Sequence, residues 1–289
     1  METVAFYGAG MLGSGFVQAL RRRGVRVNVW NRTFERAKAL EVYGATAFES
    51  AAQAARGAAR VHVCLRSDES VDSTLENALE GIAEGTPVID HTTVLPQNVD
   101  PRVRRMGERG IPFLHAPVFM GPPNAAASTG LMLASGEKAL FERVRAALEP
   151  MTGTLWYLGE RSDVAAVFKL MGNAMILAVI GGMHDMFAIA QANGVDRQTA
   201  YTLFERYDPS GQIAGRGKRM AAGDYEPTWT LDMARKDADL MRQTARGYDV
   251  PLIAAVERLL REASERGLGA LDLAAIAQVP ASCAEAASR

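Results

Sequence analysis

The sequence predicts an α/β domain followed by an all-α domain, and three observations support this fold class. In the first half of the chain, short apolar runs typical of strands alternate with helix-length runs. A glycine-rich turn at Gly8–Gly13 directly follows the first apolar run, Thr3–Tyr7. Beyond residue 159 the strand patterns end, and segments with a period of 3.6 residues take over. This change predicts two domains, residues 1–161 and 162–289.

The individual elements follow from these patterns, because near-continuous apolar runs are typical of strands that a parallel sheet buries on both faces. Such strands are predicted at Thr3–Tyr7, Arg26–Trp30, Arg60–Leu65, Pro87–Asp90, Pro112–His115, Leu131–Ala134 and Thr154–Leu158. Helices between the early strands are predicted at Gly13–Arg22, Arg36–Val42 and Ser70–Leu79. Helices of the second domain are predicted at Asp163–Asn193, Arg197–Phe204, Met233–Arg246 and Pro251–Glu265.

The composition is that of an ordinary globular protein. Of the 289 residues, 48% are hydrophobic and 22% are charged, which excludes extensive disorder. The net charge of -1 argues against a nucleic-acid partner held by a broad basic surface. The two cysteines, Cys64 and Cys283, cannot form a disulfide framework. We therefore expect a soluble, cytoplasmic protein.

The most apolar stretch, residues 165–190, is the one segment that resembles a membrane span. Four polar residues interrupt it: Lys169, Asn173, His184 and Asp185. Its uninterrupted part, Ala174–Met183, is far shorter than the roughly 20 residues that a span requires. The pattern favours a buried helix and no membrane partner.

The glycine-rich turn has the G-x-G-x-x-G pattern of a dinucleotide-binding site. Gly8 permits the tight turn, Gly10 admits a pyrophosphate close to the backbone, and Gly13 allows close packing of helix on strand. The intervening residues, Ala9, Met11 and Leu12, lead into a helix whose first N–H groups attract an anion. Placed at the first strand–helix junction, the turn predicts a doubly wound Rossmann domain.

The end of the second predicted strand indicates which dinucleotide binds. A site selective for NAD usually carries Asp or Glu here to bind the ribose hydroxyls. This chain instead reads Asn31-Arg32-Thr33, with Asn31 in the carboxylate position. No carboxylate repels a 2′-phosphate, and the Arg32 guanidinium can pair with it. The sequence therefore favours NADP(H).

Further motifs extend over essentially the whole chain. They are Asp90-His91-Thr92-Thr93-Val94-Leu95-Pro96, His115-Ala116-Pro117-Val118, Lys169 followed by Gly172-Asn173, and Lys236-Asp237. In this order and spacing the sequence resembles the β-hydroxyacid dehydrogenase family, the relatives of 3-hydroxyisobutyrate dehydrogenase and 6-phosphogluconate dehydrogenase. The resemblance implies that Leu65, Arg66, Thr93 and Lys236 lie near the nicotinamide half of the cofactor. It also implies a homodimer or homotetramer.

Lys169 and Asn173 are the candidate catalytic residues. They are four residues apart, so they share one face of the predicted long helix. The neighbours of Lys169 are apolar, and burial would lower the pKa of its ammonium and make it usable for proton transfer. Asn173 would orient the substrate oxygen or the lysine. From the pattern alone a snorkelling lysine is the alternative, whereas the family resemblance favours the catalytic role.

The segment after His115-Ala116-Pro117-Val118 departs from the family. Relatives continue with S-G-G, which holds a substrate carboxylate, but this chain reads Phe119-Met120-Gly121-Pro122-Pro123. Phe119 has no hydroxyl, and the two prolines have no N–H. A bulkier or less acidic substrate is then compatible with Phe119, Met120 and Gly121 as substrate contacts, or else the first two side chains belong to the core.

No metal site is expected, because the four histidines lack ligand spacing: His62, His91, His115 and His184. Together these features predict an NADP(H)-dependent oxidoreductase that transfers hydride between NADP and a small hydroxyacid or semialdehyde, with Lys169 as general acid/base. One alternative is an imine reductase, which the departure at Phe119 favours and Lys169 disfavours. The other is a non-catalytic NADP-binding oligomerisation scaffold, which would be expected to have lost Lys169 or Lys236.

Overall fold

The computed structural model describes residues 2–279, so Cys283 and the rest of the C-terminal tail lie outside the described residues. The chain divides into two compact units, Met1–Asn173 and Ala174–Arg289. The division falls inside the long helix α8 (Val164–Ala192) rather than before it. Each unit is described by itself.

The first unit is built on a parallel sheet with strand order β3-β2-β1-β4-β5-β6. Its strands are β1 (Thr3–Tyr7), β2 (Arg26–Trp30), β3 (Thr46–Phe48), β4 (Val61–Val63), β5 (Val88–Asp90) and β6 (Phe113–His115). This order, with the switch beside β1, is that of the Rossmann fold, and the predicted doubly wound domain is confirmed. The short edge strand β3 was not predicted, because its three residues carry no apolar run.

A second, smaller sheet continues the first unit. It contains β7 (Val118–Phe119), β8 (Leu131–Ala134) and β9 (Thr154–Tyr157). Strands β8 and β9 are parallel to each other, but they lie in this separate sheet rather than in the predicted parallel sheet, and β7 is antiparallel to β8. An isolated bridge between His115 and Ser135 joins the end of β6 to the end of β8.

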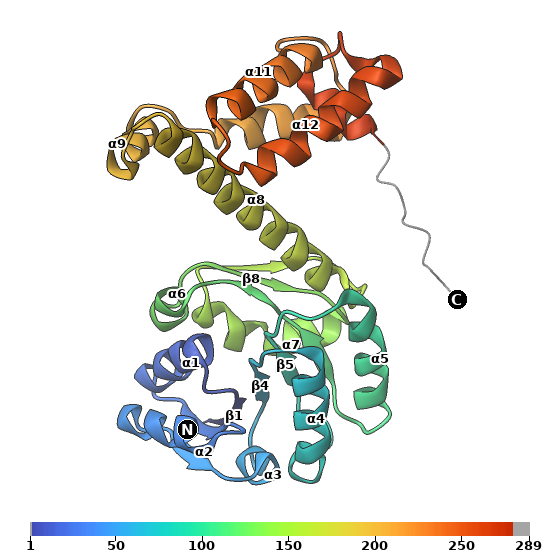
Figure 1. Ribbon diagram of the computed structural model, residues 1–289. Helices are drawn as coiled ribbons and strands as arrows, with labels where there is room; N and C mark the ends of the chain where they lie inside the picture. The colour runs from blue at the N-terminus through green and yellow to red at the C-terminus, as the bar shows by residue number, and fades with distance from the viewer. Residues whose placement is uncertain (1, 280–289) are drawn as a thin grey trace, which may run out of the picture. The chain divides into compact units, whose positions relative to one another are not determined.

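Helices cover the main sheet on both faces, as Figure 1 shows for the blue to green part of the chain. Strand β1 explains the arrangement because alternate side chains point to opposite faces. Val4 and Phe6 belong to a core cluster with Phe16 and other residues of α1 (Met11–Arg22). Ala5 and Tyr7 belong to a second cluster with residues of other helices. Both faces of β1 are therefore buried.

The remaining helices of the first unit are α2 (Phe34–Lys38), α3 (Ala51–Ala55), α4 (Asp68–Ala78), α5 (Pro96–Gly107), α6 (Pro122–Ala127) and α7 (Lys138–Leu148). The second unit is helical over its described residues. After α8 it contains α9 (Arg197–Tyr201), α10 (Lys218–Ala222), α11 (Leu231–Thr244) and α12 (Pro251–Ala263). Helices α11 and α12 share a small apolar core that includes Leu231 and Leu260.

The prediction of a buried helix at residues 165–190 is wrong for the single chain. Helix α8 forms, but only 11% of its most apolar 18-residue window is buried. Its exposed side chains include Met171, Leu177, Val179 and Ile180. By length and composition α8 is the one helix among residues 2–279 that could cross a membrane, with a mean hydropathy of 1.9 in that window. The apolar pattern of the sequence predicts the helix, but it does not show which surface packs against that helix.

Candidate functional site

The glycine-rich turn lies at the carboxyl end of β1, where it is packed against the neighbouring strand ends. The Gly8 N–H donates to the Trp30 carbonyl at 2.9 Å, and Gly8 adopts a φ of +111°. A Cβ at Gly8 would lie 2.1 Å from the Cys64 carbonyl oxygen, and one at Gly13 would lie 2.1 Å from the Gly8 oxygen. Both glycines are therefore required by the close approach of backbone to backbone.

Gly10 differs from its two neighbours in the motif. A Cβ built on Gly10 meets no atom of the described protein within 4 Å, and its φ of -76° suits any residue. The space beside it faces the start of α1, where N–H groups without helical partners favour an anion. This open space can accommodate a pyrophosphate, and a Cβ at position 10 would intrude into it.

Asn31 fixes the turn rather than standing free at the strand end. Its side-chain oxygen accepts the Ala9 N–H at 3.1 Å, and its amide donates to the Thr33 carbonyl at 2.8 Å. Arg32 is exposed next to it, and among residues 2–279 no hydrogen bond or ion pair of its guanidinium is recorded. Arg32 is thus the available cation at the end of β2. The bond from Asn31 to the turn is not readable from the sequence.

The ends of β4 and β5 are tied together by a threonine that the sequence did not single out. Thr92 is buried, its hydroxyl accepts the Leu65 N–H at 3.0 Å, and its own N–H donates to Asp90 at 2.9 Å. This arrangement leaves Thr93 and Arg66 exposed at the strand ends. The Asp90–Thr93 stretch therefore shapes the edge that the glycine-rich turn also occupies.

Two contacts attach the start of α8 to the first unit. The Ala165 N–H donates to the Ser135 hydroxyl at 2.9 Å, and Ser135 donates to the Ser162 carbonyl. Ala166 is buried in the same core cluster as Val94, the residue after Thr93. Since Lys169 lies one turn beyond Ala166, the helix brings it toward the end of β5.

Lys169 is buried against an aromatic ring. Its side chain is 9% exposed, and its Nζ lies 4.1 Å from the centroid of the Phe119 ring. Burial lowers the pKa of the Lys169 ammonium below the usual lysine range. Within residues 2–279 no hydrogen bond or ion pair of this ammonium is recorded. Asn173, one turn further on, is half-buried.

The segment after Phe119 offers few donors for an anion. The Gly121 N–H donates to the side-chain oxygen of Asn124 at 3.0 Å, and Pro122 and Pro123 have no N–H. A Cβ at Gly15 would lie 2.8 Å from the Pro122 oxygen, so this segment contacts helix α1. The structure thus brings the predicted substrate segment beside the helix that opens at the glycine-rich turn.

Two residues of interest lie in the second unit. The Lys236 ammonium is exposed and pairs with Asp237 at 2.9 Å, so its assignment to the nicotinamide stays a prediction. His184 contacts Asp185, which is fully buried and accepts the Ile253 N–H near the start of α12. That bond gives Asp185 a structural role. Across residues 2–279 no group of three or more His, Cys, Asp or Glu residues could hold a metal ion.

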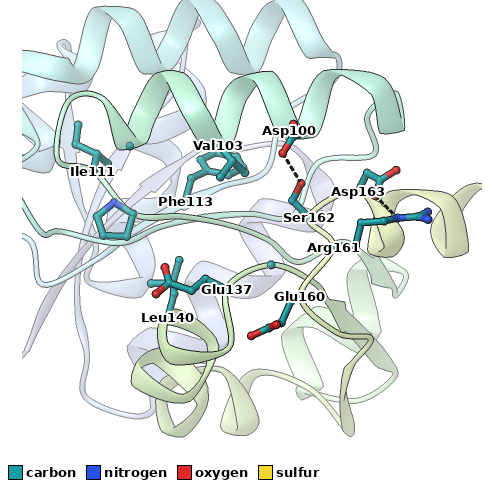
Figure 2. Close-up of a pocket in the computed structure, with 13 residues that line it drawn as sticks. Asp100, Val103, Ile111, Phe113, Glu137, Leu140, Glu160, Arg161, Ser162 and Asp163 are labelled. Atoms are coloured by element: carbon teal, nitrogen blue, oxygen red, sulfur yellow. Dashed lines mark hydrogen bonds and ion pairs between the residues drawn. The ribbon is translucent and has the colours of Figure 1, made fainter.

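A pocket of about 700 Å³ lies elsewhere in the first unit (Figure 2). Its lining residues include Pro112 at the amino end of β6, together with Glu137 and Glu160. The strands of the main sheet are parallel, so this end is opposite the edge with the glycine-rich turn. None of the predicted site residues lines the pocket, and it is separate from the candidate site.

Two family models match consecutive parts of the chain, and they meet just before helix α8. Residues 3–159 match the model of the NAD binding domain of 6-phosphogluconate dehydrogenase. Residues 164–280 match the model described as NAD-binding of NADP-dependent 3-hydroxyisobutyrate dehydrogenase. Together the two models account for nearly the whole chain.

Individual relatives match over nearly their full length. Glyoxylate/succinic semialdehyde reductase 1 of Arabidopsis thaliana is 27% identical over 280 residues, covering 94% of this chain and 96% of the relative. The 3-sulfolactaldehyde reductase of Escherichia coli is 28% identical over 288 residues, with coverages of 96% and 95%. A solved imine reductase from Streptomyces aurantiacus superposes with a TM-score of 0.87 at 26% identity, with coverages of 96% and 99%. The chain belongs to the 3-hydroxyisobutyrate dehydrogenase-like family of NAD(P)-binding oxidoreductases, whose members include hydroxyacid and semialdehyde reductases.

Proposed function

We propose that this chain is an NADP(H)-dependent reductase of small semialdehydes, which in reverse oxidises the corresponding hydroxyacids. The observation that carries the proposal is the buried Lys169 ammonium, which has no recorded carboxylate partner within the described residues. Residues 1–161 would bind the cofactor, and residues 162–289 would form the substrate and dimerisation domain. Leu65, Arg66, Thr93 and Lys236 would contact the nicotinamide half of the cofactor.

The proposed chemistry divides between cofactor and protein. When bound, the nicotinamide supplies hydride to the carbonyl carbon or accepts it in reverse. Lys169 donates a proton from Nζ to the carbonyl oxygen during reduction. In alcohol oxidation the neutral amine accepts the hydroxyl proton. Asn173, on the same helix face, orients the substrate oxygen.

A panel of substrates tests the proposed function. NADPH oxidation should be measured with semialdehydes, keto acids and cyclic imines, and NADP+ reduction with hydroxyacids. Turnover of semialdehydes or hydroxyacids supports the proposal. Turnover of cyclic imines alone would replace it with imine reduction, and tight NADPH binding without turnover would favour a binding scaffold.

Imine reduction is the second candidate because of the segment after Phe119. There the Gly121 N–H already donates to the side-chain oxygen of Asn124, and the two prolines that follow have no N–H to donate. A substrate carboxylate therefore finds fewer donors than S-G-G would offer. This observation favours a neutral substrate, and the retained Lys169 favours a carbonyl compound.

The cofactor preference rests on Arg32. Arg32→Asp should lower the NADPH/NADH selectivity by about tenfold to a hundredfold, because a charge-assisted bond to the 2′-phosphate is lost and a repulsive charge is added. The ratio of kcat/KM for the two cofactors is the measurement. Arg56→Asp, an equal charge change at an exposed site after α3, serves as the control. An unchanged ratio in the Arg32 variant would mean that the assignment to NADP(H) is wrong.

We propose a homodimer or homotetramer because the apolar surface of α8 is exposed in the single chain. We also propose that the protein is cytoplasmic. A helix this apolar and this exposed usually marks an interface. Light scattering should give a mass of two or four times 31.1 kDa. Leu177→Asp, at a position 70% exposed in the single chain, should weaken assembly without unfolding the protomer. A wild-type mass of one chain would contradict the proposal.

A further inference from the structure

Phe119 makes two close contacts on helix α8, and neither of them would help to bind a substrate carboxylate. Its ring lies under the Lys169 ammonium, with 4.1 Å from Nζ to the centroid. The edge of the same ring faces Gly172, where a Cβ would lie 2.2 Å from Cζ and 2.6 Å from Cε1. Lys169 and Gly172 are three residues apart on α8, so they share one face of the helix. Phe119 therefore fits between a cation and a glycine.

The chemistry of this contact is specific to a charged lysine. The face of an aromatic ring attracts a cation and leaves a neutral amine nearly unaffected. Burial acts in the opposite sense and lowers the pKa of Lys169. The protonation state of Lys169 therefore reflects a balance between burial, which favours the neutral amine, and the ring face, which favours the ammonium.

We propose that Phe119 is a positioning residue, seated against Gly172, that holds the Lys169 ammonium charged and in place for proton donation. This inference rests on the proposed function of Lys169. It adds that the aromatic ring at 119 keeps Lys169 in the proton-donating form that carbonyl reduction needs. Gly172 is then required because any side chain there displaces the ring.

The first variants separate a charge effect from packing. Phe119→Leu keeps apolar volume but removes the ring face. Carbonyl reduction needs the ammonium, so kcat should fall about tenfold at high pH and change little at low pH, which moves the basic limb of the profile to lower pH. Incorporation of 3,5-difluorophenylalanine at position 119 keeps the shape and weakens the ring face, so it should move the limb in the same direction. Tyr is unsuitable, because its hydroxyl would point at Gly172.

Gly172→Ala tests the seat of the ring. It should move the limb as Phe119→Leu does, and the double variant should show no more than the effect of Phe119→Leu alone, because both changes remove one contact. Phe168→Leu is the matched control: Phe168 precedes Lys169 on α8 but its ring packs on Trp156. That variant should leave the pH profile in place.

A direct titration keeps this inference independent of activity. The chain has only five lysines, so ε-13C labelling allows the Lys169 resonance to be identified by its loss in Lys169→Arg. The Lys169 titration midpoint should fall in Phe119→Leu and in the difluorophenylalanine protein. An unmoved midpoint in both would overturn the inference while leaving the reductase proposal intact. A wild type with no NADPH-dependent turnover would overturn the reductase proposal, and the titration would still report the contact of Phe119 with Lys169.

Discussion

Lys169→Ala should lower kcat for carbonyl reduction by roughly 10²–10⁴-fold, which is the usual contribution of a positioned general acid. The ammonium is the proton donor, and burial has removed most of the water that could replace it. Stopped-flow measurement of NADPH oxidation under single-turnover conditions isolates this step. The dissociation constant of NADPH should change by less than about threefold, because the proposed role of Lys169 concerns the substrate oxygen.

The pH dependence of turnover should also report the protonation state of Lys169. Burial lowers the pKa of Lys169, so turnover in the reductive direction should begin to fall at a lower pH than for an ordinary lysine. In the oxidative direction the neutral amine is needed, so turnover should rise over the same range. Lys138→Ala, on the exposed face of α7, is the matched control and should retain both limbs. Full turnover by Lys169→Ala with normal NADPH binding would exclude Lys169 as the acid/base.

The sequence predicted the parts of the fold that local patterns determine. The order of apolar runs, the glycine-rich turn and the change to helical periodicity indicated a doubly wound sheet followed by helices. Strands β3 and β7 were missed because they are two or three residues long, and only their pairing with neighbours makes them strands. The prediction that α8 is buried was wrong for the single chain, because an apolar pattern predicts a helix but does not show which surface packs against it.

The candidate site shows the same limit at the level of single residues. Lys169 could be identified from the sequence because it is a charged residue among apolar neighbours, and Gly10 because it belongs to the G-x-G-x-x-G pattern. The bonds of Asn31 to Ala9 and of Thr92 to Leu65 depend on strand ends meeting in space, 22 and 27 residues apart. Likewise, the seat of Phe119 on Gly172 joins β7 to α8, which no local spacing encodes.

Gly10→Ala and Gly13→Ala should separate cofactor binding from folding within one motif. Gly10 has open space and an ordinary φ, so its alanine variant should retain the wild-type Tm. Its NADPH dissociation constant should rise by at least about tenfold, since the new methyl group occupies the space proposed for the pyrophosphate and tenfold corresponds to only about 1.4 kcal/mol.

Gly13→Ala should behave in the opposite way, with stability lost first. Its Cβ would lie 2.1 Å from the Gly8 oxygen, and the conflict is between backbone atoms that cannot rotate away. Overpacking of this kind costs about 1–3 kcal/mol or more, which should appear as a lower Tm in calorimetry before any ligand is added. If Gly10→Ala instead bound NADPH as wild type does, the pyrophosphate would have to pass elsewhere. The two glycines are three residues apart, but a Cβ at Gly10 meets open space and one at Gly13 meets backbone, so the two variants separate cofactor binding from stability.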